Sequence, residues 1–288
     1  MAAIRKVVFP VAGLGTRMLP ATRSLPKEML PVVDKPVIQY AFEEAAAAGC
    51  EEFVFVTGRG KTLIEDHFDR AYELFDTLAR KAKEKELRAL EAQVPKAGGV
   101  VYTRQQQPLG LGHAVWCARH AVGREPFGVI LVDDLIHSRT PCMAQLADAH
   151  SRTGGNIIAV MEVPHEHTAR YGVLNPGADD GSLVEVRGLV EKPKPAEAPS
   201  RLAVIGRYIL LPEVFDHLEL QQTGAGGEIQ LTDAMARLIG NQPFHGLRFE
   251  GRRFDCGDKL GYLEAIVALA LDRPELREGF SDTLRRYL

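Results

Sequence analysis

Apolar residues recur along the chain in short runs that alternate with helix-favouring stretches and turn residues. Short runs rich in β-branched and aromatic residues are typical of buried strands, and they lie at 7–9, 53–57, 99–103, 127–132, 157–163, 183–190 and 202–211. Helices are expected at 37–48, 233–239, 259–271 and 274–288. Strand, helix and strand at this spacing predict parallel pairing through crossover helices. The pattern therefore predicts a Rossmann-like α/β fold with a mixed, mainly parallel sheet flanked by helices.

The stretch 61–93 departs from this pattern. It is charged and helix-favouring, its apolar residues are helically spaced, and its middle is polar on all sides. A solvated helical excursion and a contact between subunits both explain it, and the two interpretations stay open.

Composition narrows the classes of function. The chain has 288 residues, 45% of them hydrophobic and 25% charged, which is ordinary for a globular protein with a large core. A net charge of −3 argues against nonspecific binding to nucleic acid or to an anionic membrane. An anionic substrate must therefore be held by cations placed locally.

Cysteine spacing and hydropathy predict the compartment. The four cysteines lie far apart without a Cys-x-x-Cys pair, so neither a zinc site nor a disulfide framework is indicated. The first residues lack the apolar core of a signal peptide, and no apolar run is long enough to span a bilayer. We expect a cytoplasmic protein with no membrane or nucleic-acid partner.

The loop after the first strand carries a strong chemical signal. Gly13 and Gly15 allow positive φ and close approach of a ligand, and successive N–H groups of such a loop can converge on an anion. Arg17 adds a planar fork of donors that matches phosphate oxygens, and Lys27 adds a point charge. These residues predict a polyphosphate site. On the two glycines alone, an ordinary turn whose Arg and Lys face water is the alternative.

Two common phosphate-binding motifs are absent. A dinucleotide fingerprint needs glycine or alanine where Met18 stands, which counts against a dehydrogenase. Gly60-Lys61-Thr62 imitates the end of a P-loop, but Phe55 occupies the place of its first glycine.

Acidic residues follow the apolar run at 127–132. Asp133 and Asp134 lie where open α/β sheets bind ligands, and their carboxylates could hold a Mg²⁺ that bridges phosphates. A pair of acidic turn residues is the alternative. His165-Glu166-His167 also suggests a metal, but a turn after Pro164 explains it better because no further ligand has suitable spacing.

Several spaced motifs carry a family resemblance. Residues 13–17 (Gly-Leu-Gly-Thr-Arg), 27–31 (Lys-Glu-Met-Leu-Pro) and 34–36 (Asp-Lys-Pro) together resemble the signature of the sugar-nucleotide pyrophosphorylases, and within them the bacterial enzymes that join UTP to glucose 1-phosphate. Further motifs follow in the family's order at 105–110, 170–173, 191–193, 228–233 and 253–258.

The resemblance implies an architecture and an assembly. It implies a nucleotide-diphospho-sugar transferase fold with one domain over 1–288, in which about 1–150 binds nucleotide and 151–288 binds sugar phosphate. It also implies a homodimer or homotetramer.

The resemblance also implies a reaction. An oxygen of glucose 1-phosphate would attack the α-phosphorus of UTP in line, with Mg²⁺ as cofactor, giving UDP-glucose and pyrophosphate. A phosphate oxygen is already ionised at neutral pH, so catalysis should rest on positioning and charge stabilisation. The alternatives are a thymidylyltransferase acting on glucose 1-phosphate and a catalytically silent regulatory relative that binds UDP-glucose.

The family's roles carry over onto matching residues. The implied catalytic residues are Arg17, Lys27 and Lys192. The implied nucleotide-binding residues are Ala12, Gly13, Gly15, Thr16, Gln105 and Gly110. The implied sugar-binding residues are Gly172, Glu191 and Lys192, and the implied metal ligands are Asp133 and Asp255.

Three of these regions also admit an interpretation from side-chain chemistry. A glutamine amide suits the edge of uracil, and on this chemistry alone Gln105, Gln106 and Gln107 all stay open. The resemblance assigns the role to Gln105, and we expect Gln106 and Gln107 to be exposed. Thr232 is expected to cap the helix that follows it, and Asp258 is expected to cap the next.

Overall fold

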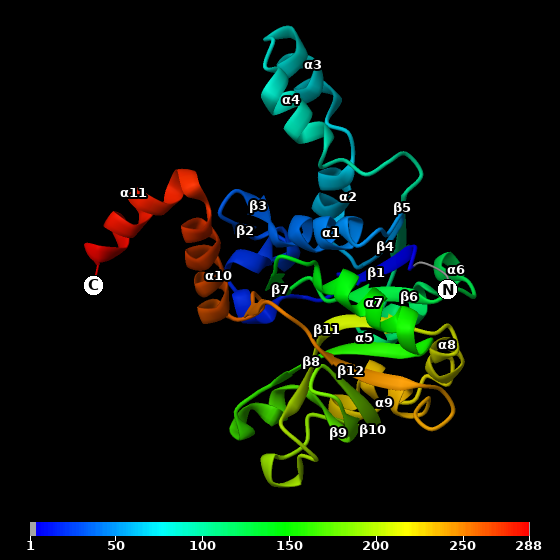
Figure 1. Ribbon diagram of the computed structural model, residues 1–288. Helices are drawn as coiled ribbons and strands as arrows, with labels where there is room; N and C mark the ends of the chain where they lie inside the picture. Colours follow the sequence, from blue (N-terminus) through cyan, green and yellow to red (C-terminus); the bar gives the residue numbers. More distant parts are fainter. Residues whose placement is uncertain (1–3, 288) are drawn as a thin grey trace.

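The computed structural model describes residues 4–287 and is built around a nine-stranded sheet (Figure 1). The strands are ordered β5-β4-β1-β6-β11-β8-β12-β10-β9. The first four of these come from the first half of the chain and run parallel: β5 (Val100–Arg104), β4 (Glu52–Thr57), β1 (Lys6–Pro10) and β6 (Phe127–Ile130).

Strands from the second half of the chain complete the same sheet. They are β11 (Leu202–Leu210), β8 (Asn156–Glu162), β12 (Phe244–Arg248), β10 (Leu183–Glu191) and β9 (Gly172–Asp179). Among them only β8 and β12 pair in parallel, whereas β11 is antiparallel to β6, β8 and β9. The predicted mixed α/β sheet is confirmed, and every antiparallel pair in it includes a strand from the second half.

The turn between β9 and β10 follows Asp180. β9 continues through Pro176 and Gly177, although a Pro-Gly pair is more typical of a turn than of a strand. The chain reverses after Asp180, where its carboxylate accepts hydrogen bonds from the backbone N–H groups of Ser182 and Leu183.

Helices cover both faces of the sheet. One hydrophobic cluster packs against α1 (Val37–Ala47), α7 (Cys142–Thr153) and α10 (Lys259–Asp272), and the other against α5 (Leu111–Cys117), α8 (Val214–Leu218) and α9 (Leu231–Ala236). Strand β1 shows why its sequence lacks polar alternation: Val7 and Phe9 enter the first cluster and Val8 enters the second.

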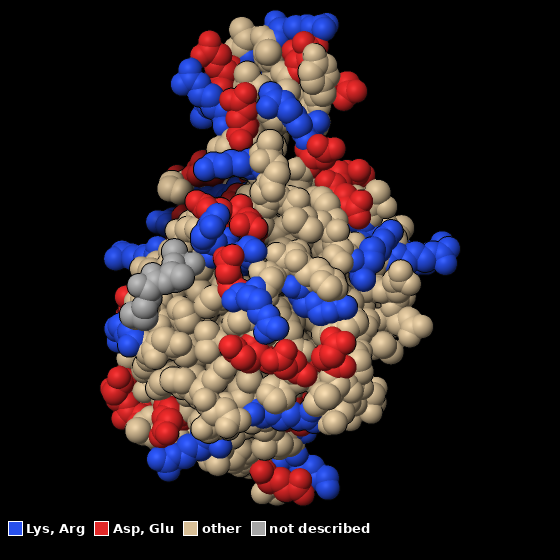
Figure 2. Space-filling model, turned by 90° about the vertical axis from the view of Figure 1, so that its right-hand side faces the viewer, with Lys and Arg blue, Asp and Glu red and all other residues tan. Residues whose placement is uncertain are grey.

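Two helical segments extend from this body (Figure 1). The stretch 61–93 forms α2 (Thr62–Phe68), α3 (Tyr72–Arg80) and α4 (Glu84–Glu91), and the last two make a charged knob at the top of Figure 2. Phe75 is the buried residue of α3, while Tyr72 is 71% exposed. The stretch is therefore helical as its apolar spacing predicted, and its charged surface is exposed in the single chain. The other segment is α11 (Pro274–Arg285), which follows α10.

A small second sheet joins distant parts of the chain. β7 (Asp134–His137) pairs with β13 (Arg252–Asp255), and Asp134 lies opposite Asp255 in this register. The short strands β2 (Pro31–Val32) and β3 (Lys35–Pro36) form a further pair. Within residues 4–287 no helix is both long enough and apolar enough to cross a bilayer.

Candidate active site

Two cavities meet at the edge of the sheet where β1, β5 and β6 end. The first, of about 550 Å³, is lined among others by Ala12, Gly13, Gly15, Thr16, Lys27, Gln105 and Gly110. The second, of about 410 Å³, is lined among others by Arg170, Gly172, Glu191, Lys192, Thr232 and Asp255. The cavities share five lining residues: Arg17, Leu111, Leu131, Asp133 and Glu228. The residues that the sequence singled out therefore line one continuous cleft.

The loop after β1 has the conformation that its glycines suggested. Gly15 has a φ of 68°, and a Cβ at this position would lie 3.1 Å from Cβ of Lys27 and 3.1 Å from Cγ2 of Thr22. The Thr22 hydroxyl donates a 2.7 Å hydrogen bond to the Gly15 carbonyl. This packing fixes the loop against Lys27, and Arg17 emerges from the next turn with 57% of its side chain exposed.

A cation–carboxylate cluster lies at the junction of the two cavities. Lys27 Nζ is 2.6 Å from Asp133 Oδ2, and Arg17 Nη2 is 3.7 Å from the same oxygen. Burial opposes the charge on both partners, but the Coulombic attraction outweighs it. The pKa of Lys27 is consequently raised and the pKa of Asp133 lowered. Both groups are therefore charged at neutral pH.

Asp134 points away from this junction. Its Oδ1 accepts a 2.7 Å hydrogen bond from Arg253 Nε and a second from Arg253 Nη2, and its Oδ2 accepts one from the Gly206 N–H at 2.9 Å. Burial raises the pKa of Asp134 although Arg253 works in the opposite direction. The protein itself therefore engages both oxygens of Asp134.

Asp255 is held more loosely. Its Oδ2 faces Arg170 at 3.6 Å, Arg253 at 3.6 Å and Arg17 at 3.9 Å, all longer than a hydrogen bond. Its Oδ1 accepts a 3.1 Å hydrogen bond from the Gly257 N–H. Pairing of β7 with β13 brings Asp255 to Asp133, although the two are far apart in sequence.

The space beside Asp133 and Arg17 depends on a glycine. A Cβ at Gly257 would lie 2.5 Å from Arg17 Nη2 and 2.7 Å from Asp133 Oδ2. Two carboxylates fit a hard divalent cation such as Mg²⁺, which commonly takes one or two protein carboxylates and completes its shell with water and substrate phosphates. Within residues 4–287 no group of three potential metal-binding side chains occurs, so substrate would have to complete the shell.

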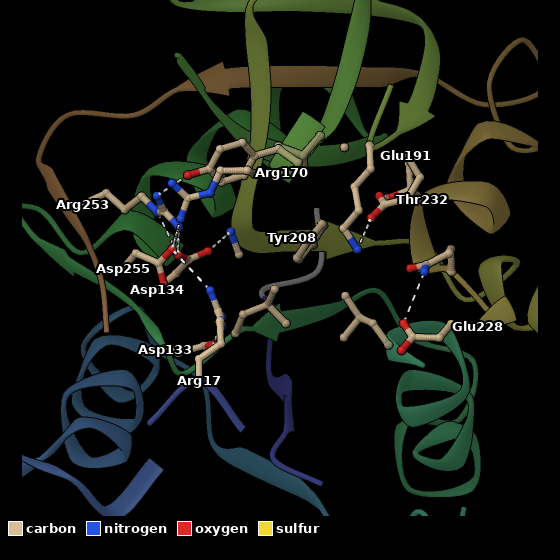
Figure 3. A pocket seen from close by; sticks show the side chains of 18 residues that line it. Arg17, Asp133, Asp134, Arg170, Glu191, Tyr208, Glu228, Thr232, Arg253 and Asp255 are labelled. Atoms are coloured by element: carbon tan, nitrogen blue, oxygen red, sulfur yellow. Dashed lines mark hydrogen bonds and ion pairs between the residues drawn. The ribbon is translucent and has the colours of Figure 1, made fainter. Parts of the chain in front are cut away.

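The far side of the second cavity is arranged around Glu191 (Figure 3). Its Oε2 accepts a 2.7 Å hydrogen bond from the Thr232 hydroxyl, and its Oε1 lies 3.2 Å from Lys192 Nζ. Lys192 has a φ of 46°, a strained conformation for a residue with a side chain. A Cβ at Gly172 would lie 3.1 Å from Thr232 Oγ1 and 3.3 Å from Glu191 Oε2. Glycine therefore keeps this wall of the cavity open.

Thr232 does not cap a helix, so that prediction was wrong. Helix α9 begins at Leu231, Gln230 occupies its cap position, and no side chain caps it. Because the helix begins two residues earlier than expected, the Thr232 hydroxyl is free to reach Glu191. The prediction for Asp258 is confirmed, because its carboxylate accepts hydrogen bonds from the N–H groups of Leu260 and Gly261 at the start of α10.

Gln105 lies at the other end of the cleft. It is 8% exposed, whereas Gln106 and Gln107 are exposed as predicted. Its Nε2 lies 3.0 Å from the Gly110 carbonyl and 3.0 Å from His113 Nδ1. No hydrogen bond from the described residues reaches its Oε1, which leaves an acceptor for a ligand N–H. Gly110 has a φ of 108°, and a Cβ there would lie 2.8 Å from the Ile229 carbonyl oxygen.

Sequence reasoning did not assign roles to three residues that line the cleft. Arg170 and Arg253 approach Asp255 from one side, and Glu228 borders both cavities (Figure 3). All three fall within motifs that carried the family resemblance, at 170–173, 228–233 and 253–258. Their place within these motifs was the one sign in the sequence that they belong to the site. Only the structure shows which residues of each motif face the cavity.

Comparison with known proteins agrees with this arrangement. Residues 6–271 match the family described as Nucleotidyl transferase. The chain is 54% identical over 257 residues to the UTP–glucose-1-phosphate uridylyltransferase of Komagataeibacter xylinus, which covers 89% of this chain and 90% of that protein. It resembles the structure of UDP-glucose pyrophosphorylase from Acinetobacter baumannii with a TM-score of 0.90 at 39% identity, over 99% of this chain and 100% of the other.

A second solved structure carries a bound nucleotide. It is described as the UTP-bound enzyme of Acinetobacter baumannii, and it has a TM-score of 0.90 at 40% identity over 98% of both chains. The chain therefore belongs to the nucleotidyl transferase family, among the UTP–glucose-1-phosphate uridylyltransferases.

Proposed function

We propose that this protein makes UDP-glucose and pyrophosphate from UTP and glucose 1-phosphate. The observation that carries the proposal is the meeting of two cavities at Asp133 and Arg17. One cavity has a glycine-rich, cationic wall suited to a triphosphate, and the other has a carboxylate and a lysine suited to a sugar phosphate. The identity to uridylyltransferases over most of the chain supports the same reaction.

The first half of the chain binds the nucleotide in this proposal. The loop at 12–16 places backbone N–H groups against the phosphates. Arg17 and Lys27 hold the β- and γ-phosphates as these become the leaving group. Gln105 accepts a hydrogen bond from uracil N3–H, which its unpaired Oε1 supports, and the loop at Gly110 borders the base.

The second half binds the sugar phosphate. Glu191 accepts hydrogen bonds from sugar hydroxyls, and its contacts to Thr232 and Lys192 fix its orientation. The sugar lies against Gly172, where a side chain would crowd Glu191. Lys192 directs the sugar phosphate toward the α-phosphorus of UTP. Because that nucleophile is already ionised, no proton acceptor is required, and the chain contributes positioning and charge.

Nucleotidyl transfer by such enzymes generally uses a divalent metal. Asp133 and Asp255 are the residues that would hold it, and we assign it as Mg²⁺ because carboxylates together with phosphates are the ligands this ion prefers. When bound, the ion neutralises charge on the phosphate oxygens.

The test is pyrophosphate release with Mg²⁺ and glucose 1-phosphate, using UTP, dTTP, ATP, CTP and GTP in turn. We expect a strong preference for UTP and little release without Mg²⁺. Equal or greater activity with dTTP would make the protein a thymidylyltransferase. Tight binding of UDP-glucose without release from any triphosphate would favour the silent regulatory relative.

Assembly and location belong to the same proposal. We expect a homodimer or homotetramer in the cytoplasm. Exposed apolar residues on α10, Leu260 at 75% and Leu263 at 57%, support self-association. Sedimentation velocity at micromolar concentration tests the assembly, and a single monomeric species would contradict it.

A further inference from the structure

A buried ion pair lies directly behind the active-site lysine. Glu28 and Lys61 are 2% and 5% exposed, and Lys61 Nζ is 2.7 Å from Glu28 Oε2. Glu28 follows Lys27 in the 3-10 turn Lys27–Met29, so the two side chains leave the same turn in different directions. One reaches Asp133 at the cleft, and the other enters the protein.

Lys61 belongs to the segment that imitates a P-loop. Gly60-Lys61-Thr62 would present its lysine to phosphate if that resemblance were functional. Instead Lys61 is buried and lines neither cavity of the cleft. It precedes α2, the helix that leads to the projecting α3 and α4, and contacts join α2 to the turn that contains Lys27. The ion pair thus ties the active-site turn to the neighbouring helix.

Stability alone does not explain this pair. Burial of two charges costs so much desolvation free energy that a buried ion pair is often no more stable than apolar residues of similar size. The pair here is also incompletely satisfied, because Glu28 Oε1 is buried and has no hydrogen-bond partner among the described residues. An apolar contact would join the turn to α2 without leaving an unpaired oxygen.

The pair differs from an apolar contact in two ways that affect Lys27. It places a negative charge near the Lys27 ammonium group, and it fixes the turn from which the Lys27 side chain extends. Lys27 has Asp133 on its cleft side and the carboxylate of Glu28 on its buried side, and both favour its charged form. A lysine stem has four rotatable bonds, so the direction of its ammonium group depends on the turn that carries it.

We propose that Glu28 and Lys61 are positioning residues that hold Lys27 on Asp133, ready for the pyrophosphate leaving group. This inference rests on the proposed function, because it assigns the held lysine to the β- and γ-phosphates. Glu28 fixes the turn through Lys61 and keeps a negative charge behind Lys27. Loss of the pair should therefore slow turnover even where the fold is retained.

The experiment separates positioning from folding. Lys61→Met leaves Glu28 buried and unpaired, so its thermal midpoint should fall. In the double variant Glu28→Leu/Lys61→Met no buried charge is left, so the midpoint should recover to near that of the wild type. We expect kcat for pyrophosphate release to stay lower by on the order of 10-fold in the double variant, with KM for glucose 1-phosphate unchanged.

Two further variants keep the inference falsifiable if the double variant fails to fold. Lys61→Arg retains the pair and should keep kcat near that of the wild type. Lys35→Met is the control. Lys35 lines neither cavity of the cleft, and its Nζ is 2.6 Å from Glu43 Oε2, so its loss should leave kcat unchanged.

The outcomes are distinct. Recovery of both kcat and the thermal midpoint in the double variant would overturn the positioning role, as would a loss in Lys61→Arg equal to that in Lys61→Met. Failure of the wild-type protein to release pyrophosphate from UTP would instead refute the proposed function.

Discussion

Two cation–carboxylate pairs in this protein, one in the core and one at the cleft, have opposite surroundings. Arg207, 1% exposed in the core, donates from Nε and Nη2 to the two oxygens of Glu44 at 2.9 and 2.8 Å. Its Nη1 donates to the carbonyls of Leu131 and Gly206 at 3.1 and 2.9 Å. At the cleft, the side chains of Lys27 and Asp133 are 20% and 24% exposed, and their single short contact borders a cavity.

The difference in surroundings distinguishes a charged pair that holds the fold together from a charged pair that can bind a ligand. The core pair has hydrogen-bond partners on every side, so it has no capacity left for a ligand and can only hold elements together. The cleft pair lies beside Arg17, which is 3.7 Å from Asp133 and 3.9 Å from Asp255, both longer than a hydrogen bond. Groups arranged in this way keep bonding capacity for phosphate and metal.

The largest expected effect is on stability, in the core pair. Arg207→Met leaves Glu44 buried and unpaired, which should lower the free energy of unfolding by about 3–5 kcal/mol. Turnover per folded molecule should stay within a few-fold of the wild type. Urea denaturation measures the first quantity and pyrophosphate release the second. A stable variant that has lost its activity would contradict the structural role.

The cleft should respond in the opposite way. Asp255→Asn removes a carboxylate proposed to hold Mg²⁺, so turnover should fall on the order of 10² or more. Its oxygens make few short contacts, so the urea midpoint should change little. Steady-state kinetics over a range of Mg²⁺ concentrations tests this, and wild-type turnover at every concentration would remove Asp255 from the metal site.

Two lysines of one loop, Lys192 at the cleft and the exposed Lys194, allow the same comparison over a short distance. Lys192→Ala should reduce turnover on the order of 10² or more, because it removes the charge proposed to direct the sugar phosphate toward UTP. Lys194→Ala is the matched control, since Lys194 has 82% of its side chain exposed and pairs only with Glu197 at 3.7 Å among the described residues. Equal effects in the two variants would mean that general charge, not position, matters.

The smallest effect is expected at Thr232. Thr232→Val keeps the shape but removes the 2.7 Å hydrogen bond to Glu191. A hydrogen bond to a charged group contributes about 1.5 kcal/mol or more, so its loss should raise the KM for glucose 1-phosphate about 10-fold. The KM for UTP should not change. A selective effect on UTP instead would place Thr232 outside the sugar site.

The sequence predicted the parts of this cleft that depend on local rules. Gly15 takes the positive φ expected of its loop, and Asp133 follows a buried strand of the sheet as its neighbours indicated. These features arise from backbone conformation and from strand topology, both of which leave local patterns in the sequence.

Other features depend on contacts between distant residues and leave no such pattern. The register that sets Asp134 opposite Asp255 is fixed by pairing of β7 with β13, two short strands that the hydrophobic pattern did not reveal. Thr232 turned out to contact Glu191 because α9 begins earlier than propensity suggested. Likewise, only packing shows that Lys61 is buried against Glu28.

The most direct test of the contrast is Asp133→Asn, measured for both turnover and stability. Asp133 lies where the two cavities meet and contacts Lys27. We predict a loss of pyrophosphate release from UTP and glucose 1-phosphate on the order of 10² or more. The protein should remain folded, with a far smaller stability loss than Arg207→Met. A folded Asp133→Asn protein with nearly wild-type turnover would contradict the assignment of this junction as the active site.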